Sequence, residues 1–103
     1  MIIPKAIFLR RSYKLNNVNL EKKARIEFML ISSEIVNSLR SPHVHKLGSC
    51  SYFFSKEKFP ILASGSFPEI IMDLIFKLEG AGYLCSLITQ KDGIVIFVDW
   101  RED

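Results

Sequence analysis

The two histidines of the chain, His43 and His45, have the spacing in this sequence that is best suited to metal chemistry. They lie two residues apart after Pro42, and an HxH pair can bind a metal ion when two further ligands converge on it. The sequence contains no CxxC, HExxH or acidic cluster that would supply those ligands. We therefore expect a solvated loop here and assign no metal, cofactor or catalytic residue.

The other reactive side chains are isolated from one another along the sequence. Cys50 and Cys85 lie in strand-like segments without a CxxC spacing, which predicts buried, reduced thiols. Residues 64–66, Ser-Gly-Ser, lack the glycine spacing of a phosphate-binding loop and are better suited to begin a helix. The acidic residues of that helix are expected on its solvated side: Glu69, Asp73 and Glu79. An enzyme is therefore not expected.

Composition indicates a single soluble domain over residues 1–103. The chain is 49% hydrophobic and 24% charged, which is a foldable globular mixture. No uncharged apolar run approaches the roughly 18 to 20 residues of a membrane helix. The start Met1-Ile2-Ile3 lacks the charge and the long apolar stretch of a signal peptide. We expect a cytoplasmic protein that is not exported.

Positive charge is concentrated in the first quarter of the chain. Residues 1–25 carry seven Lys or Arg and one Glu, whereas residues 26–103 carry seven bases and ten acids. Cations interleaved with aromatic residues can hold phosphates and stack on bases. The same residues also suit an ordinary edge strand with solvated cations. The residues that would contact nucleic acid are Arg10, Arg11, Tyr13, Lys14, Lys22, Lys23 and Arg25.

The first half of the chain predicts a strand over residues 5–11, a turn over residues 16–19 and a long helix that follows. Asn19 is a suitable N-cap for that helix, and Ser41-Pro42 ends it, because proline disfavours helical geometry in the preceding residue. The core-facing residues recur at three- and four-residue steps. They are Leu20, Ala24, Phe28, Ile31, Ile35 and Leu39.

The second half predicts one more helix and three more strands. Alternation places Cys50, Tyr52 and Phe54 on the inner side of the first of these strands. Ser66 and Glu69 have the spacing of a capping box, and glycines after residue 79 suit a C-cap. The expected apolar face of this helix is Phe67, Ile70, Ile71, Leu74, Ile75 and Leu78. The expected elements are a strand over 49–54, a packed loop over 55–65, a helix over 66–79, and strands over 83–90 and 94–100.

Asp92-Gly93 predicts a tight type I′ turn between the last two strands, since both central residues of that turn need positive φ. This turn fixes the register of the hairpin and therefore which side chains share a face. The expected core-face pairs are Thr89 with Ile96, Leu87 with Val98, and Cys85 with Trp100, while Ile88 lies beside Phe97 on the opposite face.

These elements predict an α+β fold with a mixed sheet of three or four strands, two helices packed on one face, and a C-terminal β-hairpin. The connection between the strands over 49–54 and 83–90 has the length of a crossover unit, so these two strands should run parallel with a right-handed connection. The other face of the sheet would be only partly covered, by the N-terminal segment.

Both helices and the hairpin carry apolar residues on the side that should face water. A domain of 103 residues has little room for a second core, so the surplus indicates a protein partner or self-association, such as a homodimer. We expect a small non-enzymatic protein-binding or regulatory module, with nucleic-acid binding as the alternative. The expected interface residues are Ile26, Leu30, Met72, Phe76, Ile88 and Phe97.

Residues 74–100 form a helix that ends at Gly82-Tyr83 and a hairpin that closes on alternating Ile94, Ile96, Val98 and Trp100. This quarter of the chain resembles many short accessory proteins of tailed phages and large DNA viruses. The resemblance implies a small host-directed or regulatory protein, and it assigns no functional residue.

Overall fold

The computed structural model describes the backbone of residues 3 and 5–101, and the side chains of these residues except 8 and 12–16. The predicted α+β class is confirmed, with a C-terminal hairpin and three strands. The elements are α1 (Ala6–Leu39), α2 (Pro42–His45), β1 (Ser49–Ser55), α3 (Pro68–Gly80), β2 (Leu84–Gln90) and β3 (Gly93–Asp99).

The sheet has the order β1-β3-β2, and both pairings are antiparallel. The prediction of a mixed sheet was therefore wrong for the described residues. Because β1 and β2 are each antiparallel to β3, they run in the same direction, as the crossover length predicted. The C-terminal strand β3 lies between them, so the two parallel strands are not hydrogen-bonded to each other.

The N-terminal third is helical, so the predicted strand over residues 5–11 and the turn over residues 16–19 were wrong. Helix α1 begins at Ala6 and continues for 34 residues. The sequence between Lys5 and Arg40 contains neither glycine nor proline. Its asparagines each cost at most about 0.7 kcal/mol of helix propensity. This cost is too small to interrupt a helix whose C-terminal part packs against the core.

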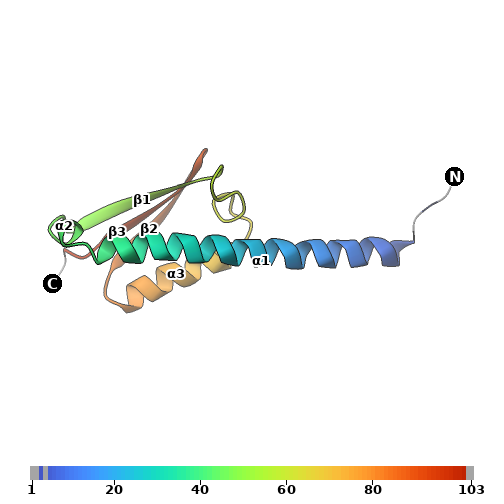
Figure 1. Cartoon of the computed structure of the whole chain (residues 1–103), viewed down its shortest axis with the longest axis horizontal. Helices are drawn as coiled ribbons and strands as arrows, with labels where there is room; N and C mark the ends of the chain where they lie inside the picture. Colours follow the sequence, from blue (N-terminus) through green and yellow to red (C-terminus); the bar gives the residue numbers. More distant parts are fainter. Residues whose placement is uncertain (1–2, 4, 102–103) are drawn as a thin grey trace.

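Helices α1 and α3 lie on one face of the sheet, as predicted, and the core fills the space between the layers (Figure 1). Ile31 and Ile35 of α1 are fully buried together with Ile96 and Val98 of β3. The side chains that α3 contributes to this core are Ile70, Ile71, Leu74, Ile75 and Leu78, and the sequence predicted all five. The apolar stripe of α3 therefore fixes how it packs on the sheet.

A partly buried hydrogen bond links β1 to α1. The hydroxyl of Tyr52 donates to Ser38 Oγ at 2.8 Å. Burial raises the pKa of Tyr52 to about 12, more than the bond to Ser38 lowers it. Tyr52 and Phe54 both face the core, as the alternation of residues 49–54 predicted.

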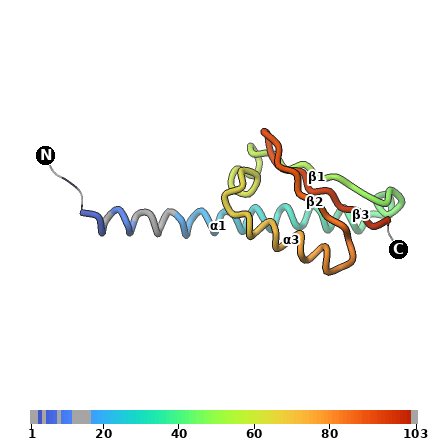
Figure 2. Tube along the Cα trace, turned by 180° about the vertical axis from the view of Figure 1, so that it is seen from behind, coloured from blue at the N-terminus to red at the C-terminus, as the bar shows by residue number. Residues whose placement is uncertain are grey.

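The predicted core face of α1 is confirmed over the part of the helix that lies against the sheet. Ala24 is buried, and Phe28 and Leu39 pack against the core. Leu20 is exposed. It belongs to the N-terminal half of α1, and the N-terminal part of this helix extends away from the sheet (Figure 2). This long helix gives the molecule its dimensions of 67 × 25 × 18 Å.

The hairpin register differs from the prediction by two residues. Ile88 pairs with Val95, Leu87 with Ile96, and Gln90 with Gly93, so Lys91-Asp92 is the two-residue loop. A positive φ is found at Gly48, Gly65 and Gly82 among the described residues, and Gly93 has none. The predicted type I′ turn was therefore wrong. Since the shift is an even number, each side chain keeps its predicted face.

Two glycines have clear structural reasons. Gly82 has φ +102°, a conformation that residues with a side chain rarely adopt, and it follows the last turn of α3 as predicted. At Gly93 the backbone of β1 comes so close that a β-carbon would collide with the carbonyl oxygen of Phe54. The predicted cap of α3 is absent: Phe67 is the N-cap residue and makes no side-chain bond, while Ser66 Oγ lies 3.0 Å from Ser64 Oγ.

Candidate interaction surfaces

The face of the sheet opposite the helices is uncovered and carries a row of apolar side chains. Phe53 of β1 pairs with Val95 of β3, which pairs with Ile88 of β2. Phe53 is 51% exposed and Ile88 is 50% exposed. No element of the described chain packs on this side, since α1 and α3 both lie on the other (Figure 1). We call Phe53, Val95 and Ile88 the sheet row.

Serines flank the sheet row, and one more aromatic residue lies beside it. Phe97 is half-buried between Ser51 and Ser86 on the two neighbouring strands. The sequence predicted Ile88 and Phe97 for this face, and both lie there. It missed Phe53 and Val95, although the alternation that turned Tyr52 and Phe54 inward also turns Phe53 outward.

A second apolar surface lies on α1, on the side away from the core. Ile26 and Leu30 are exposed there, as predicted, and Met29 between them is also exposed. Residues three and four apart are neighbours on a helix surface, so these three form one patch. Met29 was not among the predicted interface residues, although its place on the helix follows from the same spacing.

The expected patch on α3 is only half present. Phe76 is exposed, but Met72 is partly buried and packs against the core. An unbranched, flexible thioether readily fills a gap at the margin of a core, and this explains why Met72 does not form the predicted pair. Because the helices occupy one layer and the sheet row lies on the other side of the sheet, the predicted interface residues do not form one continuous surface.

The N-terminal part of α1 extends beyond the body of the molecule (Figures 1 and 2). Ile7, Leu9 and Val18 are exposed along it. The basic residues there are exposed too: Arg10, Arg11, Lys22, Lys23 and Arg25. Within the described part of the chain, Arg25 has an ion pair, with Glu21 at 3.2 Å. The side chains of Tyr13 and Lys14 lie outside the described residues.

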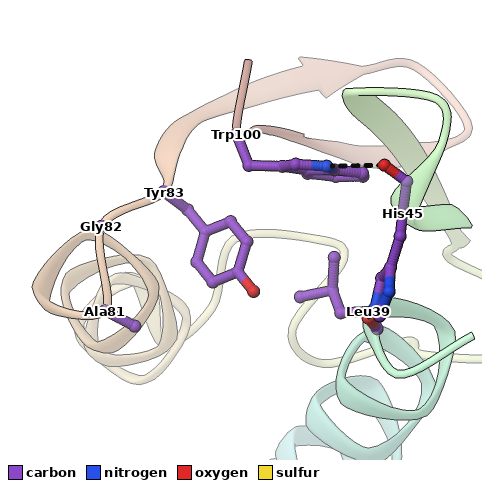
Figure 3. Close-up of a pocket in the computed structure, with 6 residues that line it drawn as sticks. All are labelled: Leu39, His45, Ala81, Gly82, Tyr83 and Trp100. Atoms are coloured by element: carbon purple, nitrogen blue, oxygen red, sulfur yellow. Dashed lines mark hydrogen bonds between the residues drawn. The ribbon is translucent and has the colours of Figure 1, made fainter. Parts of the chain in front are cut away.

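An aromatic pocket of about 350 Å³ lies where the end of α1 approaches the start of β2 (Figure 3). Its walls are Leu39, His45, Ala81, Gly82, Tyr83 and Trp100. The Tyr83 and Trp100 rings meet edge to face with centroids 6.2 Å apart. The indole Nε1–H of Trp100 donates to the carbonyl oxygen of His45 at 3.2 Å. These walls suit a small apolar or aromatic group.

The histidine pair does not form a metal site in the described part of the chain. His43 and His45 lie in the short helix α2, and Nε2 of His45 donates to the carbonyl oxygen of Leu39. No group of three His, Cys, Asp or Glu side chains with metal-binding geometry occurs among the described residues. His45 instead connects α2 to the end of α1.

Both cysteines are free and half-buried. Cys50 and Cys85 each lie opposite Val98, on the two strands that flank β3. Two strand spacings separate them by roughly 9.5 Å, which is too far for a disulfide. Burial raises the pKa of Cys85, and the nearby carboxylate of Glu79 raises it further. A thiol of this kind is a poor nucleophile at neutral pH.

The acidic residues of α3 make no shared site. Asp73 pairs with Lys77 at 3.0 Å, as an i,i+4 ion pair on the exposed side of α3. Glu69 and Glu79 are exposed, and Glu79 lies near the thiol of Cys85 at the start of β2.

Glu27 is a buried carboxylate that was not predicted from the sequence. It is 8% exposed, and its carboxylate accepts hydrogen bonds from the backbone amides of Ile61 and Leu62, the shortest at 2.8 Å. These bonds hold residues 59–63 against α1. An acid within the apolar sector of a helix was the available signal, because buried carboxylates need partners.

Comparisons with protein-family models, curated proteins and solved structures found no match to this chain. No helix in the described range combines the length and the apolar character required to cross a membrane.

Proposed function

We propose that this protein is a small non-enzymatic protein-binding or regulatory module whose partner-binding surface is the open face of the sheet. The observation that carries the proposal is the exposure of the sheet row, Phe53, Val95 and Ile88, on a face that no described element covers. An antiparallel sheet with one solvated face normally presents polar side chains there, whereas the sheet row places apolar side chains side by side across all three strands of this face.

The energy available from covering this face is substantial. Burying a large apolar side chain fully is worth about 1.5 to 3 kcal/mol, and Phe53 and Ile88 are each half exposed. Ser51 and Ser86 next to the row can form a polar rim around an apolar centre, an arrangement typical of protein interfaces. The partner would be a protein with a complementary apolar surface.

A cytoplasmic location is part of this proposal. Two free thiols held too far apart to pair are compatible with a reducing compartment.

Replacing Phe53 by glutamate should abolish partner binding without unfolding the chain, because this side chain is half exposed. We expect proteins captured by the tagged wild type from a lysate of the source cells to be lost with Phe53→Glu. Quantitative mass spectrometry of the captured proteins is the measurement.

The matched control for this experiment is Gln90→Glu, which adds the same charge to the same face outside the sheet row. Captured proteins should be retained by this variant. A set of captured proteins that does not differ between wild type and Phe53→Glu would refute the role of the sheet row.

Nucleic-acid binding is the second candidate, and one observation favours it. The basic residues Arg10, Arg11, Lys22 and Lys23 are exposed on a helix that extends away from the body. A helix of this kind is narrow enough for the major groove of DNA. The acidic excess of residues 26–103 disfavours such binding by the rest of the chain, so we rank this function below protein binding.

If α1 binds a duplex, the affinity should fall with roughly one power of salt concentration for each phosphate contact. The double variant Arg10→Glu, Arg11→Glu should then reduce the slope of log affinity against log salt concentration by about two. Fluorescence anisotropy with a short duplex at several salt concentrations measures it. Lys56→Glu with Lys58→Glu, which places the same charge change on the body, is the control. Equal affinities for all three proteins would exclude this function.

A further inference from the structure

Strand β2 is an edge strand that lacks the usual protection against pairing with another strand. It pairs with β3 on one side, and no other strand of the described chain lies beside it. Every second residue therefore directs its backbone N–H and C=O groups outward. Residues 84–90 contain no charged residue and no proline, which are the features that normally block edge pairing.

The side chains of β2 are exposed on both faces of the sheet. Ile88 and Leu84 are exposed on the open face, and Leu87 is 37% exposed on the face that carries the helices. On β1, by contrast, the inward side chains Tyr52 and Phe54 are buried. Of the two edges, β2 therefore has more apolar surface left to bury.

A cavity of about 110 Å³ lies next to this edge, on the helix side of the sheet. Its walls are apolar for the most part: Leu62, Gly65, Pro68, Ile71, Leu87, Thr89 and Ile94. It is smaller than the roughly 150 Å³ cavity that accepts benzene, so it suits a branched aliphatic group. An added strand would place alternate side chains at this position, as in β-strand addition to a sheet edge.

The charges at the two ends of β2 favour one orientation of a second copy. Glu79 lies near the start of β2, close to the thiol of Cys85, and Lys91 follows the end of β2. Antiparallel pairing of two β2 strands brings Lys91 of each copy towards Glu79 of the other. The C-terminal end of α3, which carries a partial negative charge, lies at the same place.

We propose that two copies of this chain associate by antiparallel pairing of their β2 strands, with the two-fold axis at Leu87, to form a continuous six-stranded sheet. The inference rests on the proposed protein-binding function and names one partner, a second copy. In this register Leu87 faces Leu87 of the second copy, and Cys85 faces Thr89. Leu87 of each copy then covers the cavity beside the edge of the other.

In this register Lys91 of each copy lies near Glu79 of the other, so exchanging the two charges in the same chain should preserve the attraction. The dimer can be tested by this exchange. Lys91→Glu alone and Glu79→Lys alone each place like charges together at two positions of the dimer. Both residues are exposed in one copy, so the variants should fold. We expect either single change to weaken dimerisation about tenfold, and the double variant to restore it. Sedimentation velocity over a concentration series measures the dimer constant.

A cross-linking experiment tests the position of the axis. In a chain with Cys50→Ser and Cys85→Ser, Leu87→Cys should form a disulfide-linked dimer, because directly opposite residues lie about 4.5 to 5.5 Å apart. The control Phe53→Cys, on the other edge strand, should not. The proposed pairing would be overturned if the chain is a monomer at all concentrations, or if the single and double charge variants dimerise as strongly as the wild type. Capture of proteins that depends on Phe53 would then still support the proposed function.

Discussion

Replacing Glu27 by alanine is expected to lower the free energy of unfolding by about 3 kcal/mol. The carboxylate accepts hydrogen bonds from the amides of Ile61 and Leu62, and it is almost completely buried. Without it, two amide groups beside α1 lose their acceptor, and each buried donor without a partner costs roughly 1 to 3 kcal/mol. Water that enters the space left by the side chain would return part of that energy.

Urea unfolding followed by the fluorescence of Trp100 measures this loss. Glu34→Ala on the same helix is the matched control, because Glu34 is exposed, and it should change stability by less than about 0.5 kcal/mol. Glu27→Gln should lie between the two, since the amide keeps one oxygen that can accept. Equal stabilities of the Glu27→Ala and Glu34→Ala proteins would show that the loop does not depend on this carboxylate.

Helix α3 and the three strands could be predicted because each has a strong local signal, whereas the short helix α2 was expected to be a loop. The apolar spacing of α3, the left-handed glycine at Gly82 and the alternation of β1 all act over a few residues, and the structure confirms each of them. The packed loop was also predicted correctly: Phe59, Leu62 and Ala63 are buried. These apolar residues pack the loop against the core, while Pro60 stays exposed.

The N-terminal segment could not be assigned in the same way. Residues 7–9, Ile-Phe-Leu, form too short an apolar stretch to distinguish a strand from a helix. A helix that has formed around Ala24 and Ile31 extends by one hydrogen bond per residue, whereas starting it anew is costly. The absence of glycine and proline over 34 residues was the better guide.

The candidate surfaces were predicted in part, and the same kind of information was missing for each of them. Periodicity assigns a side chain to a face, and it placed Ile26, Leu30, Phe76 and Ile88 correctly on exposed faces. It does not report what lies across from that face. For this reason Met72 was predicted to be exposed, although it packs at the margin of the core. The cavity beside β2 depends on how α3 and residues 62–65 approach the sheet, which no local pattern contains.

Replacing Gly93 by alanine is expected to lower the free energy of unfolding by about 2 to 3 kcal/mol. A β-carbon at this position would meet the carbonyl oxygen of Phe54 and lie 2.9 Å from the α-carbon of Ser55. Both are backbone atoms of β1, so relief requires β1 to move away from β3. Such a movement would also strain the buried contacts of Phe54, which packs edge to face on Phe59.

Replacing Gly80 by alanine is expected to raise the free energy of unfolding, in contrast to the same change at Gly93. Comparing the two variants shows whether the loss at Gly93 comes from the close approach of β1 or from replacing glycine as such. Gly80 is the last residue of α3, and a β-carbon there would have nothing within 4 Å. Gly80→Ala should therefore raise the stability by about 0.5 to 1 kcal/mol through helix propensity and a less flexible unfolded chain. Urea unfolding of both proteins measures the difference. Stabilisation by Gly93→Ala would mean that β1 and β3 do not approach as closely as the register of Ser55 opposite Gly93 requires.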